Sequence, residues 1–478
     1  MVRHALAAVV AAMAATSSLV TAQTASGAPV SGTTADLPAP FDRPALVQLS
    51  TDPYRTPKAA QYSTAVEPDS FSFGSTIVSA FQVGRFVDGA AVNNGFATST
   101  DSGRSWRNGV LPGITVAAGG TALRASDPVV AYDAAHDVWL ISSLAVGEFS
   151  RAVVTSRSTD GGLTWQSPVF TAAGTVDKNW ITCDNTPTSP FYGHCYTQWD
   201  RVGAFNHIKM STSTDGGQTW GPALSPPDQP RDIEAIGGQP VVQPNGTVVV
   251  PFADFDDSMV SFRSTDGGAS WSDITQISTF ERRQVAGQLR DGALPSADVD
   301  AAGRVYVVWQ DCRFRLDCRS HDLVLSTSVD GLTWTGPVRI PLDPLTSRFD
   351  HFIPGLAVQP GTSGDTAHLA LTYYFYPDTN CSVGTCRLTV GFTSSPDGGQ
   401  SWTRPLALAG PMNITDIALT TSGRMVGDYI STSFVGDRAY PFFAVGKPKD
   451  GPMYDEAIYT TAVPLPVPDA TLVQVDTP

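Results

Sequence analysis

The sequence contains few charged residues, and cations are the scarcer kind. Asp, Glu, Lys and Arg make up 16% of the 478 residues, and 30 Lys and Arg stand against 45 Asp and Glu, which gives a formal net charge of −15. Proteins that bind nucleic acid rely on clustered Lys and Arg to neutralise phosphates. The composition therefore argues against a nucleic-acid partner.

Long apolar runs are also missing. The apolar run at residues 5–15 is too short for a bilayer-spanning helix, which needs about 20 residues. It follows a cationic start and precedes a small-residue cleavage site at residues 20–22, with 26–28 as an alternative, so residues 1–22 are predicted to be a secretory signal peptide. We expect a secreted protein that is a monomer and has no transmembrane segment.

Cysteine is sparse, and its spacing does not match a zinc site. No cysteine pair has the two-residue spacing of a zinc knuckle and the chain has only seven His, so no metal or other cofactor is expected. In an oxidising compartment the simplest arrangement joins near neighbours in sequence. Three disulfides are therefore predicted, namely Cys183 with Cys195, Cys312 with Cys318, and Cys381 with Cys386.

Long helical periodicity is absent, and turn-forming residues are abundant. The chain contains 43 Gly and 36 Pro, together with many Val, Thr and Ser, which suits short strands joined by turns. An all-β fold is predicted over residues 45–465. Residues 23–44, rich in Ala, Thr, Gly and Pro, are expected to form a disordered lead-in, and residues 466–478 a C-terminal tail.

One short motif occurs six times, and each copy ends on a tryptophan. In this motif the Asp carboxylate can accept backbone N–H bonds inside a hairpin turn, Gly supplies positive φ, and the Trp buries a large ring against the sheet. The copies recur at intervals of roughly 50 to 70 residues, which indicates one repeat array. They are Ser99-Thr-Asp-Ser-Gly-Arg-Ser-Trp106, Ser158-Thr-Asp-Gly-Gly-Leu-Thr-Trp165, Ser213-Thr-Asp-Gly-Gly-Gln-Thr-Trp220, Ser264-Thr-Asp-Gly-Gly-Ala-Ser-Trp271, Ser328-Val-Asp-Gly-Leu-Thr-Trp334 and Ser395-Pro-Asp-Gly-Gly-Gln-Ser-Trp402.

This motif resembles the Asp box of the Asp-box propellers, whose best-known members are the sialidases. The resemblance implies a β-propeller of four-stranded antiparallel blades. Residues 425–463 show the strand pattern of a further unit without a box, and residues 45–50 form an orphan strand before the first unit. Seven blades closed by this N-terminal strand are preferred, and the six blades usual for sialidases are the alternative.

The strand order of such a blade separates the polar residues into two faces. The starts of the innermost strands and the ends of the second strands share the face opposite the Asp-box turns. Carboxylates and arginines that gather there would suit a glycan-binding cleft, although polar residues at strand ends often only satisfy backbone groups. The substrate-binding candidates on this face are Arg85, Arg290, Arg348, Asp177 and Gln239.

The sialidase resemblance also implies a catalytic set. Sialidases use a Tyr nucleophile with a Glu base and an Asp acid/base, and the chain has only five Glu. We expect Tyr429 as nucleophile, Glu67 as its base and Asp127 as acid/base. The family's Arg-Ile-Pro motif precedes its first box, whereas Arg339-Ile340-Pro341 follows the fifth box here and is predicted to be an outer strand.

Three classes of function remain open. The first is a secreted sialidase-like glycoside hydrolase, an exo-α-sialidase, with a glycan or glycoconjugate as substrate. The second is a hydrolase or lyase that acts on another polysaccharide. The third is a non-catalytic propeller that binds glycan or protein, because a fold by itself does not assign a function.

Overall fold

The computed structural model describes residues 43–148, 150–202, 206–229, 235–254 and 256–467. The predicted signal peptide, most of the lead-in and most of the C-terminal tail lie outside these residues. The chain divides into Met1–Ala39 and Pro40–Pro478, and every described residue belongs to the second unit. Strands make up 51% of the structure, so the predicted all-β class is confirmed.

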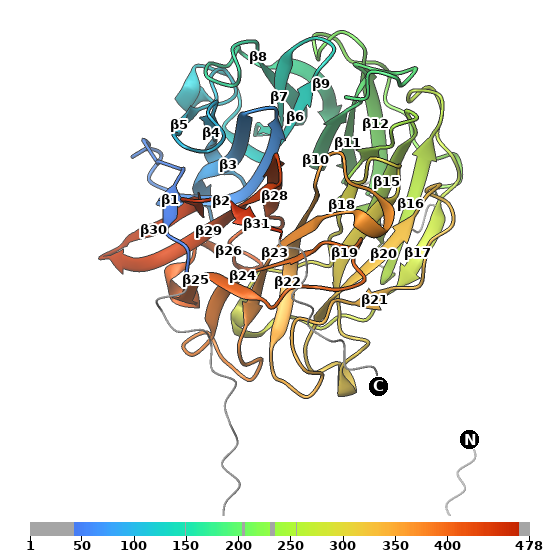
Figure 1. The fold of residues 1–478 in the computed structure, drawn as a ribbon. Helices are drawn as coiled ribbons and strands as arrows, with labels where there is room; N and C mark the ends of the chain where they lie inside the picture. Colours follow the sequence, from blue (N-terminus) through green and yellow to red (C-terminus); the bar gives the residue numbers. More distant parts are fainter. Residues whose placement is uncertain (1–42, 149, 203–205, 230–234, 255, 468–478) are drawn as a thin grey trace, which may run out of the picture. The chain divides into compact units, whose positions relative to one another are not determined.

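Strands that follow one another in sequence pair antiparallel in successive sheets (Figure 1). The first two sheets are β2 (Ala60–Phe73), β3 (Thr76–Phe86), β4 (Ala91–Ser99) and β5 (Arg107–Val110), then β6 (Arg124–Asp133), β7 (Val138–Val146), β8 (Arg151–Ser158) and β9 (Val169–Gly174). A bridge between β4 and β6 and another between β2 and β30 connect these two sheets and the last one into a single hydrogen-bonded network. The next two are β10 (Val176–Cys183), β11 (Cys195–Arg201) and β12 (His207–Ser213), then β13 (Ala235–Ile236), β14 (Val241–Val242), β15 (Val248–Asp254), β16 (Ser258–Ser264) and β17 (Thr275–Thr279).

The second half of the chain continues the pattern. Its sheets are β18 (Ser296–Val299), β19 (Val305–Asp311), β20 (Asp322–Ser328) and β21 (Val338–Arg339), then β22 (Asp350–Val358), β23 (Leu369–Tyr376), β24 (Arg387–Ser395) and β25 (Leu406–Asn413), and finally β28 (Ser431–Val435), β29 (Arg438–Asp450) and β30 (Met453–Thr461). Short pairs are made by β26 (Leu419–Thr420) with β27 (Gly423–Arg424), and by β31 (Leu465–Pro466) with β29.

Helical structure in the described ranges is limited to three-residue 3-10 turns. None of the helices described is long and apolar enough to cross a membrane. The turns are η2 (Val116–Ala118), η3 (Ala286–Gln288), η4 (Leu316–Cys318), η5 (Gly364–Thr366) and η6 (Ile414–Asp416).

The two ends of the described chain pair with each other. Strand β1 (Leu46–Gln48) runs antiparallel to β30, with Leu46 opposite Thr461. The backbone N–H of Leu49 also donates to the carbonyl of Ile458 at 2.7 Å. The predicted pairing of the orphan strand with the last repeat is therefore confirmed, and Figure 1 shows β1 beside β30.

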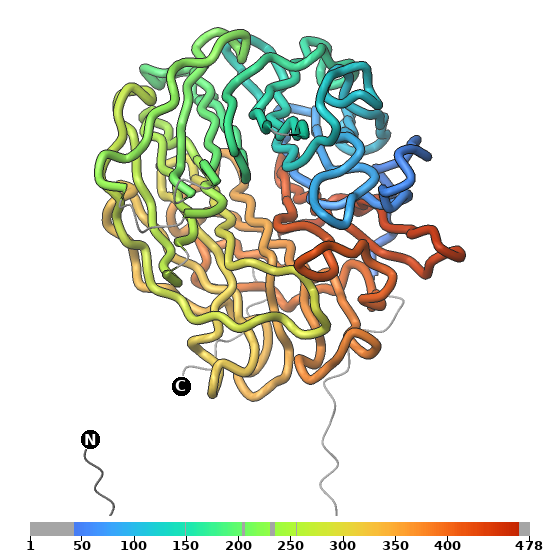
Figure 2. The backbone as a smooth tube through the Cα atoms, turned by 180° about the vertical axis from the view of Figure 1, so that it is seen from behind, coloured from blue at the N-terminus to red at the C-terminus, as the bar shows by residue number. Residues whose placement is uncertain are grey.

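The inner strands of successive sheets contact one another. Figure 2 shows the chain passing around the fold in sequence order, from blue to red. The contacting pairs are β2 with β6, β6 with β10, β10 with β14, β14 with β18, β18 with β22, β22 with β28, and β28 with β2. Buried carboxylates tie some of these strands together: Asp69 accepts the N–H of Val130 at 2.8 Å, and Asp298 accepts the N–H of Val358 at 2.7 Å. Burial raises the pKa of Asp69 to about 7 and that of Asp298 to about 6.

The hydrophobic core lies between neighbouring sheets. One cluster, for example, joins Val78 of β3 to Ile141 of β7 and to Trp165, the last residue of the second motif copy. Ring burial at Trp165, Trp271 and Trp402 leaves each less than a tenth exposed. These three tryptophans thus anchor their turns in the way the sequence predicted.

The repeated motif forms the predicted hairpin turn. In the third copy the Asp215 carboxylate accepts the N–H groups of Gln218 and Thr219 at 3.0 and 2.9 Å, and the hydroxyl of Thr219 at 2.6 Å. Gly216 and Gly217 have φ of 71° and 74°, which a residue with a Cβ adopts only with strain. The motif is therefore a turn whose donors are satisfied locally.

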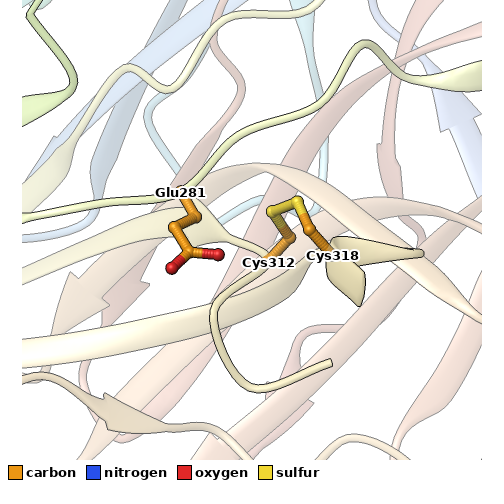
Figure 3. Close-up of side chains that lie close together, drawn as sticks. All are labelled: Glu281, Cys312 and Cys318. Atoms are coloured by element: carbon orange, nitrogen blue, oxygen red, sulfur yellow. A yellow bond between two sulfur atoms is a disulfide. The ribbon is translucent and has the colours of Figure 1, made fainter. Parts of the chain in front are cut away.

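All three predicted disulfides are present, and each lies within one sheet unit. Figure 3 shows the carboxylate of Glu281 beside the Cys312–Cys318 disulfide. Because both sulfurs are committed to the S–S bond, they are not thiolates and cannot act as the soft ligands a metal would require. The Cys312–Cys318 disulfide cross-links the segment that follows β19.

Candidate functional site

A cavity of about 640 Å³ opens where the innermost strands of the first three sheets begin. Five of the eight candidate residues line it: Glu67, Arg85, Asp127, Asp177 and Arg290. They come from β2, β3, β6, β10 and the segment before β18, so residues from distant parts of the sequence converge on one space. The prediction that strand starts share a face explains this convergence.

A bulge within each of three inner strands presents these side chains. The pairing register slips after Val66 in β2, after Ser126 in β6 and after Asp177 in β10. At these slips Glu67, Asp127 and Lys178 have φ of 55°, 45° and 48°. Left-handed backbone at a non-glycine residue costs on the order of 1–3 kcal/mol and often marks a functional site.

The same bulge recurs in β22, where Ile353 has φ of 52° and no polar side chain. The bulge is thus a property of the repeat. What distinguishes the cavity is that acidic and basic side chains occupy the bulge positions of β2, β6 and β10.

Lys178 lies at the centre of a buried charge cluster. Its Nζ forms an ion pair with Asp428 and lies 3.6 Å from Glu67 Oε1 and 4.0 Å from Asp127 Oδ2. Burial alone would lower the pKa of Lys178, but Asp428, Asp127 and Glu67 outweigh it and raise that pKa above its ordinary value. Lys178 is therefore a permanent cation that three carboxylates share.

Glu67 is held almost completely out of water. Its side chain is 1% exposed, its Oε1 accepts the N–H of Asp428 at 3.2 Å, and its Oε2 accepts a hydrogen bond from Gln82. Burial raises the pKa of Glu67 to about 7, with Lys178 opposing and Asp127 reinforcing the shift. A carboxyl group with this pKa can exchange a proton near neutral pH.

Asp127 lies on the next inner strand, and its Oδ2, 4.0 Å from Lys178 Nζ, is free to accept a hydrogen bond. Its Oδ1 accepts the hydroxyl of Ser126 at 2.5 Å, whereas its buried Oδ2 has no hydrogen-bond partner among the described residues. Asp177 is more open to the cavity and accepts a hydrogen bond from Arg151 at 3.4 Å. Burial raises the pKa of Asp177.

The arginines that line the cavity differ in how many of their N–H donors have a partner. Arg290 is bound at both Nε and Nη2 by the Asp428 carboxylate, with Nε 2.7 Å from Oδ1. Arg85 is buried, donates to Gln82 at 2.5 Å, and has an Nε without a partner among the described residues. Arg124 and Arg151 line the outer part of the cavity.

The sequence analysis did not assign roles to Lys178 and Asp428, although both lie at strand starts beside assigned residues.

Tyr429 does not make the predicted contact with Glu67. Its hydroxyl donates to the carbonyl of Pro128 at 3.2 Å, and its ring packs edge-on against Trp180 at 5.2 Å. Burial raises the pKa of Tyr429 well above its ordinary value. The side chain is packed in the wall beneath the cavity and is not among the residues that line it.

The structure does not bring Arg348 and Gln239 to this cavity. Arg348 is 62% exposed and lies 3.6 Å from Asp378, because it precedes β22 in an outer loop. Gln239 accepts the N–H of Ala297 and lines a separate space of about 370 Å³ between the inner strands. Both placements assumed regular strand starts, whereas these segments are irregular.

Arg339 of the Arg-Ile-Pro segment belongs to β21, as predicted, and takes part in a buried ion-pair network. Its Nε lies 2.8 Å from Asp322, and Arg315 binds both Asp322 and Asp343 at 2.5 and 2.6 Å. His351 lies 3.9 Å from Asp343. Asp322, Asp343 and His351 are close enough to hold a metal ion, but the two arginines already compensate the carboxylates.

No family model matches the chain, and no curated protein sequence does. Solved structures with similar folds include a Hadza microbial sialidase, Hz136, at 14% identity, with 90% of this chain and 98% of that chain covered and a TM-score of 0.46. They also include an ulvan lyase of a polysaccharide lyase family at 12% identity, 87% and 95% coverage and a TM-score of 0.48. A third is the α-L-arabinofuranosidase Arb93A from Fusarium graminearum at 14% identity, 73% and 98% coverage and a TM-score of 0.44. At these identities and TM-scores the likenesses carry no argument about this chain.

Proposed function

We propose that the sheets form a seven-bladed β-propeller. The contacts between first strands run from β2 through β6, β10, β14, β18 and β22 to β28 and back to β2. Strand β1 pairs with β30 and extends the strand order β28, β29, β30 by a fourth strand. The six-bladed alternative leaves this last sheet without a place of its own. Closure of this kind removes the open sheet edges that would otherwise pair with other chains.

We infer that the chain is a secreted glycan-active hydrolase that works in the 640 Å³ cavity. The observation that carries this proposal is the pair Glu67 and Asp127, two buried carboxylates on adjacent inner strands that face one ammonium, Lys178. Glycoside hydrolysis commonly needs two carboxyl groups, one of which keeps its proton near neutral pH.

The environments of the two groups suggest their roles. Glu67, with a pKa of about 7, donates a proton to the glycosidic oxygen as the bond to the leaving group breaks. The unpartnered Oδ2 of Asp127 faces the positive charge that develops on the sugar, and either activates a water molecule or bonds to the sugar carbon. Arg85, Arg290 and Asp177 would then hold the substrate hydroxyl or acidic groups.

A sialidase mechanism is the second candidate, favoured by the arginines. Arg85, Arg124, Arg151 and Arg290 line the same cavity and could hold a sugar carboxylate. In that mechanism the hydroxyl of Tyr429 would have to leave the Pro128 carbonyl and approach Glu67. The buried position of Tyr429 and the raised pKa of its hydroxyl weigh against this route.

Turnover assays with matched Glu variants test the proposal. Wild-type protein, Glu67→Gln and Glu281→Gln are assayed on chromogenic glycosides, a fluorogenic sialoside and uronate polysaccharides. The control, Glu281, is exposed and lies beside the Cys312–Cys318 disulfide, outside the cavity. Loss of general acid catalysis should lower kcat of the Glu67 variant about 100-fold or more and leave the control unchanged.

The reaction products distinguish a hydrolase from a lyase, a sialidase and a non-catalytic propeller. A new reducing end without an unsaturated sugar indicates hydrolysis, whereas ultraviolet absorbance of an unsaturated uronate indicates a lyase. Release from the sialoside alone, abolished by Tyr429→Phe, supports the sialidase mechanism. Full activity of Glu67→Gln contradicts the assignment, and binding without turnover of any glycan leaves a non-catalytic propeller.

A further inference from the structure

A second cavity adjoins the first and shares a wall with it. It has a volume of about 450 Å³ and is lined by Arg282, Arg283 and Ser422, among others. Arg290 lines both cavities, and Ser422 directly follows Thr420 and Thr421, which line the first. A ligand longer than one sugar could therefore extend from one space into the other past Arg290.

The second cavity is lined by three arginines, and one of them, Arg283, forms no ion pair with the described residues. Arg283 is partly buried, its side chain donates to the carbonyl of Arg319, and it forms no ion pair with any residue that the structure describes. A carbonyl is a neutral acceptor, so the guanidinium keeps its full charge and further N–H donors. Arg282 next to it is about half exposed and forms an ion pair with Asp257.

Asp291 lines the second cavity, and hydrogen bonds hold its carboxyl group. Asp291 accepts a hydrogen bond from Gln310 at 2.9 Å, and a longer one from the N–H of Val285 at 3.4 Å. Burial raises the pKa of Asp291, and His321 opposes this shift. Arg290 is compensated by Asp428 from the other side. Of the three arginines that line this space, Arg283 is thus the one without an ion pair among the described residues, although it interacts electrostatically with the buried Asp350.

We propose that the second cavity is a subsite for an anionic sugar, in which Arg283 binds a carboxylate or sulfate group and Arg282 flanks the entrance. The proposal rests on the proposed glycan-directed function and specifies it, because it makes the substrate an acidic oligosaccharide or polysaccharide. A planar guanidinium with free donors binds carboxylate and sulfate oxygens through two parallel hydrogen bonds. The acidic sugar would lie beside the one that is cleaved.

Binding measurements on the full-length protein test the subsite without turnover. The probes are glucuronate, glucose 6-sulfate and glucose, titrated at low salt into wild type, Arg283→Gln and Arg348→Gln. The glutamine side chain introduced by Arg283→Gln keeps amide N–H donors but carries no charge. The control, Arg348, is an exposed arginine paired with Asp378, outside both cavities.

We expect glucuronate or glucose 6-sulfate to bind the wild type and the Arg348 variant equally, and glucose not to bind. The Arg283 variant should lose about tenfold or more in affinity. The anion that binds more tightly shows whether the subsite recognises a carboxylate or a sulfate group. If the Arg283 variant does not fold, Arg282→Gln is the second variant, and we expect its affinity for the anion to be severalfold lower.

Two results would overturn the proposal: no binding of either anion, or anion binding that is unchanged in the Arg283 variant. The second result would place the anion in the first cavity. Failure here is distinguishable from failure of the hydrolase assignment, because neutral glycosides could still be cleaved in a Glu67-dependent way. Conversely, Arg283-dependent binding without any turnover would support the subsite and contradict the hydrolase.

Discussion

Lys178 and Asp428 form a buried ion pair across 250 residues of sequence, and this pair joins β10 to the segment before β28. Lys178 and Arg290 both bind the Asp428 carboxylate. Burial alone would raise the pKa of Asp428, but these two cations lower it. The charge cluster therefore links three separate segments of the chain beneath the cavity.

Removal of Lys178 should be strongly destabilising. In Lys178→Met, Glu67, Asp127 and Asp428 lose the cation they share, and an uncompensated buried charge costs about 3–5 kcal/mol. Denaturant unfolding of this variant, with Lys58→Met at an exposed position as the control, measures the loss. Equal unfolding midpoints for the two variants would show that the cluster contributes nothing to stability.

The rate of glycan cleavage should fall as the pH rises through about 7. Glu67 has its pKa raised to about 7, so the protonated form that acts as an acid is fully present below that pH and is lost above it. Replacement of Lys178 removes the charge that favours the ionised form, and should move the alkaline limb of the profile to higher pH in any folded variant. A kcat–pH profile without an alkaline limb near pH 7 contradicts the role of Glu67.

The Asp-containing turns should matter for stability and not for the site. Asp215→Ala removes four hydrogen bonds at one exposed turn, from Ser213, Gln218 and Thr219. We expect a loss of about 1–2 kcal/mol in unfolding free energy, with kcat and glycan affinity unchanged. A fully folded variant with impaired binding would mean that the ligand site lies on the turn side.

The N-terminal strand should contribute to stability far more than its length suggests. A chain that begins at Gln61 lacks β1 and the fully buried Leu49, and leaves β30 with an unpaired edge. Its melting temperature should fall by about 5 °C or more, whereas a chain that begins at Arg43 should melt like the mature protein. Calorimetry compares the two, and identical transitions would show that β1 is dispensable.

Local patterns in the sequence predicted much of the fold. The motif copies specify hairpin turns because Asp and Gly act within a few residues, and the near-neighbour cysteines pair for the same reason. The pairing of β1 with β30 could be inferred because residues 425–463 lack a fourth strand. The blade count stays a prediction from this reasoning and from the strand contacts.

The site was only partly predictable. Glu67, Asp127 and Asp177 could be placed together because inner strands begin at one end of the fold. The Tyr429 hydroxyl donates to the carbonyl of Pro128, and sequence spacing does not encode which acceptor a buried hydroxyl finds. Arg348 was expected in the cavity, but it lies in the loop before β22, where its side chain is exposed beside Asp378.

The pairing of β1 with β30 can form only late in the synthesis of the protein. A ribosome completes β1 about four hundred residues before its partner exists, so the earliest strand stays unpaired through synthesis and any passage across a membrane. Contacts of such long sequence separation form slowly. The newly made chain therefore has an interval in which proteases and other chains can reach an edge that the finished protein conceals.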